Sequence, residues 1–214
     1  MKSRRLSLLA IAIIVLVIVL DQWLKIWVKT SFYLGEELTI FTWFRLLFVQ
    51  NPGMAFGWSL GSKTALTLFR LGATAFGFWY LYKIIHRSKP STGLVVCVAL
   101  IIAGAIGNLV DSLFYGLIFN NPLPPEVAVA FPEGGGYAPF LQGQVVDMLY
   151  FPLFSFYWPD WMPFCGGEYF EFFHPIFNLA DSAVSVGVIV LILLYSGHLS
   201  LNEPKPAEPE AKQE

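Results

Sequence analysis

Charged residues are scarce in this sequence. Asp, Glu, Lys and Arg make up 13% of its 214 residues, whereas a soluble domain is about a quarter charged. Hydrophobic residues reach 56%, and this balance predicts a chain that is integrated in a membrane. The formal net charge is −2, and the few cations mostly flank apolar runs, so no nucleic-acid partner is expected.

Cysteine and histidine are rare as well: the sequence has two cysteines and three histidines. Cys97 falls in an apolar run and Cys165 in a distant loop, so no disulfide between them is expected. The predicted spans contain no cluster of His, Cys and Glu with the spacing of metal ligands. They also show no Gly-x-Ser-x-Gly motif and no Ser–His pairing, since His86 and His198 lie near the cytoplasmic ends and His174 lies alone outside. We therefore expect neither a metal nor a cofactor.

Four apolar runs are long enough to cross a bilayer, which takes about 20 helical residues. The first could be mistaken for a secretory signal, but no small-residue cleavage site follows it, so we expect an uncleaved helix. The four predicted spans are residues 6–28, 64–85, 93–119 and 175–199.

The positive charges predict the orientation of these spans. Between Ser91 and Pro204 there is no Lys or Arg. The positive-inside rule then places both termini in the cytoplasm and the loops 29–63 and 120–174 outside, in the periplasm. The cations at the cytoplasmic ends are Lys2, Arg4, Arg5, Lys83, Arg87 and Lys89.

The outer segments have distinct compositions. Residues 38–60 are β-branched and aromatic and are broken by Asn-Pro-Gly, which predicts short strands resting on the membrane face. Residues 149–173 are crowded with rings that favour the headgroup level. The fold class is thus a mainly α membrane protein: four transmembrane helices, a small periplasmic β-rich cradle and an extended aromatic-rich periplasmic loop. One domain covers 1–202, and residues 203–214 form a disordered cytoplasmic tail.

Polar side chains interrupt every predicted span, although a charge at a helix centre costs roughly 3 kcal/mol. Counting about 1.5 Å per residue from the outer helix ends places one ionisable residue of each span in a common layer, about 10–12 Å deep. These four residues are Asp21, Arg70, Asp111 and Asp181. A shared depth predicts one polar site, although ion pairs and interhelical hydrogen bonds would be structural alternatives. The polar residues are Asp21 and Lys25, Arg70, Asn108 and Asp111, and Asn178 and Asp181.

Carboxylates are what these spans hold in excess. Two close carboxyl groups share one proton, so one can act as base on water while the other polarises a carbonyl group. This chemistry predicts an aspartic protease at the membrane surface. Buried carboxylates also relay protons, so a small proton-coupled transporter is the alternative.

Five motifs occur in order along the chain and resemble those of the lipoprotein signal peptidases (signal peptidase II) of bacterial inner membranes. Each motif is modest alone, but their order on four helices of the right orientation is specific. They are DQWLK (21–25), NPGMAFG (51–57), AGAIGNLVD (103–111), VVDM (145–148) and FNLADSAVSVG (177–187).

The resemblance implies a multi-pass inner-membrane enzyme, a monomer surrounded by lipid and sensitive to globomycin, with its active site near the periplasmic face. Such enzymes cut prolipoproteins just before a cysteine that carries diacylglycerol. The motifs that match the catalytic pair give Asp147 and Asp181. The resemblance further implies substrate-groove positions at Asn51, Gly53, Asn108 and Asn178 and a structural pair of Asp21 and Lys25.

The sequence departs from the family pattern in places. Ser112 stands where the family usually has an Arg expected to hold substrate carbonyls, and Arg70, at similar depth, is a candidate to replace it. Pro52 and Met54 replace smaller residues. Long insertions flank Asp147, which makes Asp111 a rival catalytic residue, although we prefer Asp147. The inserted segments are hypothesised to form a lid or a platform on the membrane.

Overall fold

The structure is a computed structural model and describes residues 2–52 and 63–195. The predicted groove residue Gly53 and the tail 203–214 lie outside the described residues. The helices are α1 (Lys2–Ser31), α2 (Lys63–Ile85), α3 (Thr92–Val110), α4 (Gly116–Ile118) and α5 (Leu179–Tyr195), with a π-helical turn, Asp111–Tyr115, between α3 and α4. The strands are β1 (Glu37–Phe41), β2 (Phe44–Asn51), β3 (Val145–Tyr150), β4 (Phe154–Tyr157), β5 (Tyr169–Phe172) and β6 (Ile176–Phe177).

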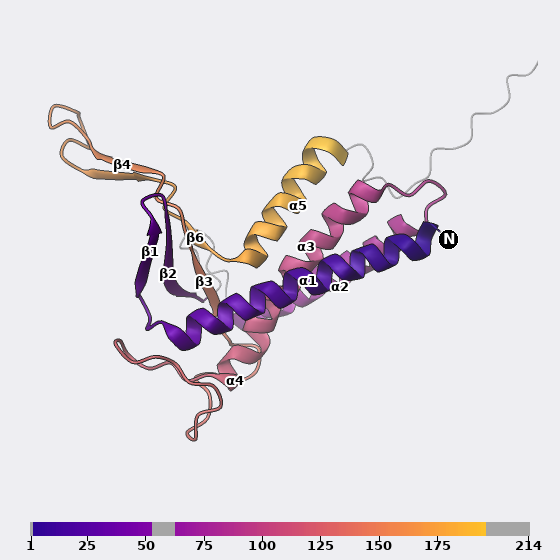
Figure 1. Cartoon of the computed structure of the whole chain (residues 1–214), viewed down its shortest axis with the longest axis horizontal. Coiled ribbons are helices and arrows are strands. Elements are labelled where there is room, and N and C mark those ends of the chain that lie inside the picture. The colour runs from indigo at the N-terminus through magenta and orange to yellow at the C-terminus, as the bar shows by residue number, and fades with distance from the viewer. Residues whose placement is uncertain (1, 53–62, 196–214) are drawn as a thin grey trace, which may run out of the picture.

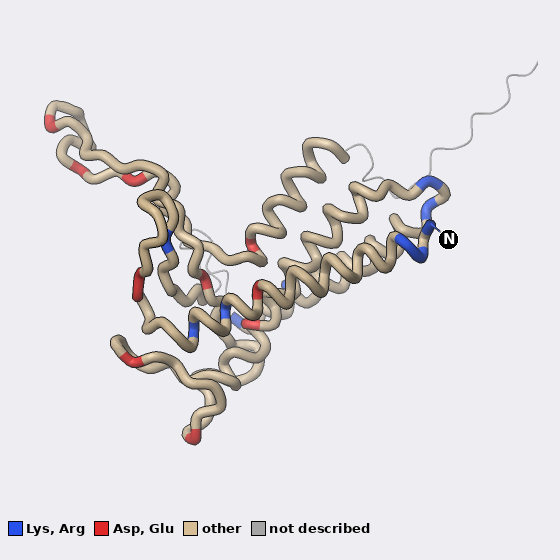
Figure 2. The backbone as a smooth tube through the Cα atoms, in the orientation of Figure 1, with Lys and Arg blue, Asp and Glu red and all other residues tan. Residues whose placement is uncertain are grey.

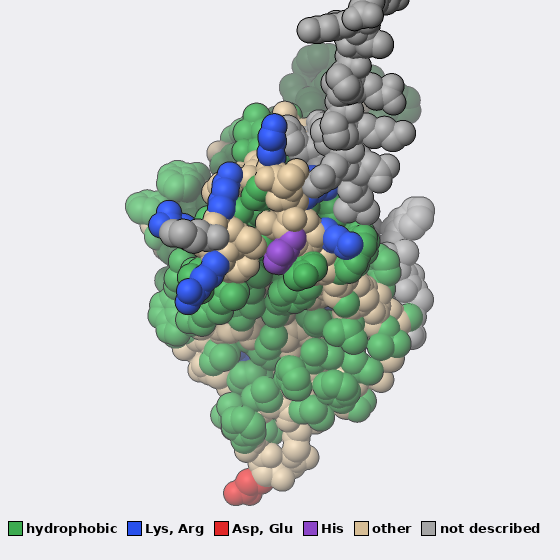
Figure 3. Space-filling model, turned by 90° about the vertical axis from the view of Figure 1, so that its right-hand side faces the viewer, with side chains coloured by type: hydrophobic (Ala, Val, Ile, Leu, Met, Phe, Trp, Pro, Cys, Tyr) green, Lys and Arg blue, Asp and Glu red, His purple; other side chains and the backbone are tan. Residues whose placement is uncertain are grey.

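All four predicted spans are helical over most of their length. Among the described residues, α1 and the continuous helix Thr92–Ile118 are long and apolar enough to cross a membrane, and α5 is a shorter apolar helix. The cations near the N-terminus and those between α2 and α3 gather at one end of the bundle (Figures 2 and 3), and the strands lie at the other end (Figure 1). A membrane protein is therefore supported, with the six cations that were predicted to be cytoplasmic at the end opposite the sheet.

Helix α3 is the centre of the bundle and packs against α1, α2 and α5. Its contact with α5 depends on small residues: a Cβ atom at Gly104 would lie 2.2 Å from the carbonyl oxygen of Ala180. A Cβ at Gly107 would lie 2.9 Å from the Cβ of Ala180. Small residues let membrane helices approach closely, and here they bring the start of α5 against α3.

A four-stranded antiparallel sheet, in the order β1-β2-β3-β6, covers the end of the bundle opposite the N-terminus. Alternation along β3 sends its side chains to opposite faces. Val146 and Met148 are fully buried in a cluster with Phe48, Tyr115 and Phe119 at the outer ends of α1 and α4. Asp147, between them, points to the other face of the sheet. The strands predicted within 38–60 are thus confirmed as β1 and β2 for the part that the structure describes.

The fourth span was predicted to begin at Pro175, and this start is wrong. Ile176 and Phe177 form β6 and pair with Tyr150 and Leu149 of β3, so α5 begins only at Leu179. Two apolar residues beside a membrane helix look the same in the sequence whether they form a strand or extend the helix. Their pairing with β3 decides in favour of the strand. The strand β6 delivers the start of α5 to the strand that carries Asp147.

The two insertions have different structures. Strands β4 and β5 form a separate two-stranded hairpin that extends away from the bundle (Figure 1). The 120–144 segment is mostly irregular and is tied to the body by isolated bridges, Tyr33 with Val127 and Phe119 with Ala130. Cys97 and Cys165 are both free, as predicted.

Candidate active site

The first turn of α5 is fixed by a reciprocal pair of hydrogen bonds. The side-chain oxygen of Asn178 accepts a hydrogen bond from the Asp181 amide at 2.9 Å, and the Asp181 carboxylate accepts one from the Asn178 amide at 3.3 Å. This is a capping box, which satisfies two amides that a helix start leaves without partners. The carboxylate also lies at the N-terminal end of α5, where the backbone amides of the first turn point towards it.

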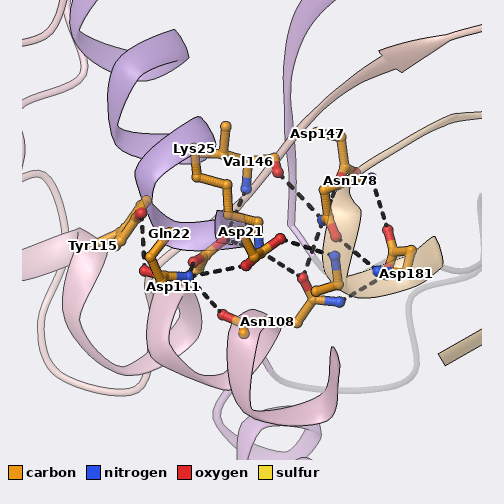
Figure 4. A network of polar contacts seen from close by, with 12 residues as sticks. Asp21, Gln22, Lys25, Asn108, Asp111, Tyr115, Val146, Asp147, Asn178 and Asp181 are labelled. Atoms are coloured by element: carbon orange, nitrogen blue, oxygen red, sulfur yellow. Dashed lines mark hydrogen bonds and ion pairs between the residues drawn. The ribbon is translucent and has the colours of Figure 1, made fainter. Parts of the chain in front are cut away.

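Asn178 connects Asp181 with Asp147. Its side-chain amide is fully buried and donates to the Asp147 carboxyl at 2.6 Å and to the Asn108 side-chain oxygen at 3.0 Å. Asn108 in turn donates to the Asp181 carboxylate at 2.7 Å. Figure 4 shows Asp147, Asn178 and Asp181 together on one side of the polar network. The two carboxyl groups, 34 positions apart in sequence, are therefore held in one hydrogen-bonded unit.

Asp147 has an unusual electrostatic environment. Its side chain is 2% exposed, and burial, followed by the charge of Asp181, raises its pKa from 3.8 to about 7. Hydrogen bonds from Asn178 and Asn51 act in the opposite direction. The Asp147 carboxyl group is therefore partly protonated near neutral pH.

The raised pKa makes a prediction for stability. A carboxyl group whose pKa rises from 3.8 to about 7 on folding stabilises the fold below pH 4, and this contribution is lost as pH rises through 7. Asp147→Asn should therefore raise the free energy of unfolding by up to about 3–4 kcal/mol at pH 8, and by much less at pH 5. Thermal unfolding in detergent at both pH values measures this. The exposed Asp160→Asn is the control, and an equal shift at pH 5 and 8 would refute the assignment.

On the other side of the network, Lys25 is the centre of a buried ion cluster. Its ammonium group lies 3.0 Å from Asp21, 2.9 Å from Asp111 and 2.8 Å from the Asn108 oxygen. An ammonium group has three donors, and these three acceptors use all of them. Asp21 and Lys25, predicted as a structural pair, form an ion pair in the structure. The second Asp21 oxygen accepts the Ala180 amide at 2.9 Å, which ties α1 to α5.

Asp111 belongs to this ion cluster. Besides Lys25, its carboxylate accepts hydrogen bonds from the Gln22 side chain at 2.9 Å and from the Val146 amide at 3.1 Å. Both of its oxygens are occupied, and its side chain is 0% exposed. These contacts connect α1, α3 and β3, and so support β3 directly beside Asp147.

Arg70 reaches the site from α2. Its guanidinium donates to the Ser112 hydroxyl at 3.0 Å, and that hydroxyl donates to the backbone oxygen of Asn108 at 2.9 Å. The charges of the three carboxyl groups at positions 181, 111 and 147 act on the guanidinium. Arg70, the predicted candidate to take over the role of the family's Arg, therefore lies beside Ser112, the position where that Arg usually stands.

Two members of the network were not predicted. Gln22 donates to Asp21 and Asp111 and accepts from the Tyr115 hydroxyl at 3.1 Å. A glutamine between Asp21 and Lys25 in an apolar run was a usable sequence signal. Tyr115 had none, because a tyrosine near the end of a span is ordinary.

Comparison with known proteins decides the family. The family model described as "Signal peptidase (SPase) II" matches residues 13–196. This chain belongs to the signal peptidase II family. A lipoprotein signal peptidase of Porphyromonas gingivalis is 50% identical over 190 residues, which cover 89% of this chain and 84% of that protein. One from Amoebophilus asiaticus is 38% identical over 187 residues, covering 85% and 75%.

Solved structures agree on the fold. A bacterial membrane enzyme solved by the in meso method at 1.9 Å resolution matches with a TM-score of 0.58 and 23% identity, covering 87% of this chain and 93% of its own. A second such structure, at 2.3 Å resolution, gives a TM-score of 0.57. These structures support the membrane fold, while the family model and the curated relatives confirm the signal peptidase II resemblance drawn from the five motifs, and with it a protease.

Proposed function

We propose that this signal peptidase II is an aspartic endopeptidase that removes the signal peptide from diacylglyceryl-modified prolipoproteins by cutting before the lipidated cysteine. The observation that carries the proposal is that Asn178 is hydrogen-bonded both to the Asp147 carboxyl group and to the Asp181 amide, which holds the two aspartates together. The names of the relatives support the substrate. In a bacterium that lacks its own enzyme, the wild-type gene should restore processing, and accumulation of unprocessed prolipoprotein despite normal expression would contradict the proposal.

The two carboxyl groups have different environments, which suggests different roles. Asp181, at the positive end of α5, takes a proton from water as the water oxygen attacks the scissile carbonyl carbon. Asp147, which burial drives towards its protonated form, gives its proton to the carbonyl oxygen. When the C–N bond breaks, Asp181 passes its proton to the leaving amine and Asp147 recovers its own. Both residues then regain their starting states.

The amides around the pair have positioning roles in this proposal. The donors of Asn108 and Asn178 reach the two carboxyl groups, so both residues orient the pair. Asn51, at the end of β2, hydrogen-bonds Asp147 and places the pair next to a strand that could bind extended peptide. Gly53, a predicted groove residue, stays a prediction because it lies outside the described residues.

The membrane arrangement is also part of the proposal. We infer four spans with both termini in the cytoplasm, because the cations near the N-terminus and those between α2 and α3 gather at the end of the bundle opposite the sheet (Figure 2). The pair then lies near the periplasmic face of the inner membrane. The acyl chains of the substrate would stay in the surrounding lipid while the peptide enters the site, and one copy of the chain would suffice.

Arg70 is proposed to bind a substrate carbonyl group, oriented by Ser112. A hydrogen bond to a charged group contributes about 1.5–3 kcal/mol, so Arg70→Gln should lower kcat/KM about 10–100-fold. The double variant Arg70→Ser with Ser112→Arg removes the guanidinium from α2 and places one at position 112, on the turn that follows α3. It should recover part of the lost kcat/KM. Steady-state kinetics measure both, and normal cleavage by Arg70→Gln would exclude the role.

The proton-coupled transporter has no support from the family assignment. It predicts ion-driven flux and no peptide cleavage. Flux measurements in proteoliposomes would separate the two functions, and the proposed peptidase should give none.

A further inference from the structure

The β4–β5 hairpin has two faces of different chemistry. Its strands pair Phe154 with Phe172 and Phe156 with Phe170, and these four rings stack on one face together with Trp158. We call this set the Phe face. The opposite face carries Ser155, Tyr157, Tyr169 and Glu171, which alternate with the phenylalanines along both strands.

The polar face is attached to the body of the protein. The Tyr150 hydroxyl on β3 donates to the Glu171 carboxylate on β5, and His174 lies 2.9 Å from the same carboxylate. These bonds lower the pKa of Glu171 and keep the carboxylate charged. The orientation of the hairpin is therefore fixed at its base, with the Phe face turned away from this contact.

No described element covers the Phe face completely. Phe154 remains 53% exposed and Phe172 44% exposed. The loop at the hairpin tip adds Trp161 at 79% and Phe164 at 103%. An isolated two-stranded hairpin is at best marginally stable in water, so this apolar surface implies a further partner.

A second copy of the chain is a poor fit for that partner. An aromatic side chain can bury about 150–250 Å². Phe154 and Phe172 are about half exposed and the other three rings of the Phe face less so, so the five rings offer at most about 500 Å². A stable interface needs about 800 Å² from each partner. A phosphate-bearing or other anionic partner is also a poor fit, because the hairpin has no Lys or Arg and carries Asp160, Glu168 and Glu171.

Lipid fits the position and the composition. The hairpin leaves the bundle at the end where the strands lie, opposite the cations, and extends sideways beyond the start of α5 (Figures 1 and 2). The nearby α5 exposes Val186 and Ile189 in the manner of a lipid-facing helix. Phe and Trp are the kinds of side chain that interfacial segments bury at the boundary of headgroups and acyl chains.

We propose that the Phe face of the β4–β5 hairpin lies in the outer interface of the bilayer, as an anchor that holds the sheet against the membrane. Only three residues separate β4 from β3, which carries Asp147, and β5 runs through His174 to β6 and the start of α5. Contact with lipid would therefore fix the depth of Asp147 and Asp181. This last consequence rests on the proposed function, whereas the lipid contact does not.

The chain provides its own probe site for a test. Cys165 is partly exposed in the hairpin loop, whereas Cys97 is buried in α3 and can be replaced as Cys97→Ala. A fluorophore on Cys165 in full-length protein is reconstituted in phosphatidylcholine vesicles that carry nitroxide lipids. Because an interfacial segment lies about 5–10 Å into the headgroup boundary, nitroxide near the headgroup should quench at least about twofold more than nitroxide deep in the acyl region.

Two double variants form a matched pair. Phe154→Ser with Phe172→Ser removes a cross-strand ring pair from the Phe face and should abolish the lipid quenching. Tyr157→Ser with Tyr169→Ser removes the cross-strand pair of the opposite face and should leave it unchanged. Anionic lipid should not strengthen the contact.

Other results would overturn the anchor. Quenching by aqueous iodide with none by lipid would place the hairpin in water. Shielding that appears only on addition of prolipoprotein would make the substrate chain the partner, and shielding that depends on protein density in the vesicles would indicate a second copy. None of these readouts requires cleavage, so failure of the proposed peptidase activity would be separately visible.

Discussion

Asp147→Asn and Asp181→Asn should each lower the rate of prolipoprotein cleavage about 10²–10⁴-fold, as expected for loss of a general acid or base. Asparagine has nearly the same shape as aspartate, and its oxygen can still accept the hydrogen bond that Asn178 or Asn108 donates. The fold should therefore survive while the proton transfer is lost. Rates of purified variants, each corrected for the folded fraction, measure the effect.

Two comparisons make this result specific. Asp160→Asn alters an aspartate in the hairpin loop and should cleave at the normal rate. Asp111→Asn changes the rival carboxylate, which is occupied by Lys25 and Gln22, and should mainly lower stability. Normal cleavage by Asp147→Asn together with lost chemistry in folded Asp111→Asn would show that the pair is assigned wrongly.

Lys25→Met should destabilise the protein by about 3–5 kcal/mol, because removing one partner from a buried ion cluster leaves the others uncompensated. Asp21 and Asp111 are 1% and 0% exposed, so neither carboxylate could turn to solvent. The loss would loosen α1 from α3 and α5 at once. Thermal unfolding in detergent and the yield of folded protein report it.

The surface pair of Arg45 and Glu37 is the control for this prediction. It joins β1 and β2 at 3.1 Å, with side chains 33% and 34% exposed. Arg45→Met should cost no more than about 1 kcal/mol, as exposed pairs do. Adding Asp21→Asn and Asp111→Asn to Lys25→Met should recover part of the loss, and a Lys25→Met protein as stable as wild type would refute the role of the cluster.

Hydropathy and charge were sufficient to predict the helices. Composition and length alone identify a run that can span the membrane, and the positions of the cations relative to those runs predict the orientation. The start of α5 could not be predicted, because Ile176 and Phe177 are as apolar as the helix that follows. Pairing with a distant strand decided their structure, and such pairing has no local signature.

The site shows the same division. Asp21 and Lys25 are four residues apart on one helix, so their ion pair followed from spacing alone. From the sequence, Asp147 could be preferred to Asp111 only by family resemblance. What places Asp147 beside Asn178 is the register of β3 against β2 and β6, and strand register has no local sequence signal. The hairpin was visible as an aromatic segment, but its alternating Phe-Ser-Phe and Phe-Glu-Phe patterns were not recognised as paired strands.

The most direct test of the account is the mass of the products from one substrate in two forms. Purified wild-type protein is incubated with a prolipoprotein that carries diacylglycerol on its cysteine, and with the same chain unmodified. The account predicts a single cut before the lipidated cysteine, none in the unmodified chain, and inhibition by a cyclic peptide of the globomycin type. A cut at another position, equal cleavage of both forms, or full activity of the Asp181→Asn protein would contradict it.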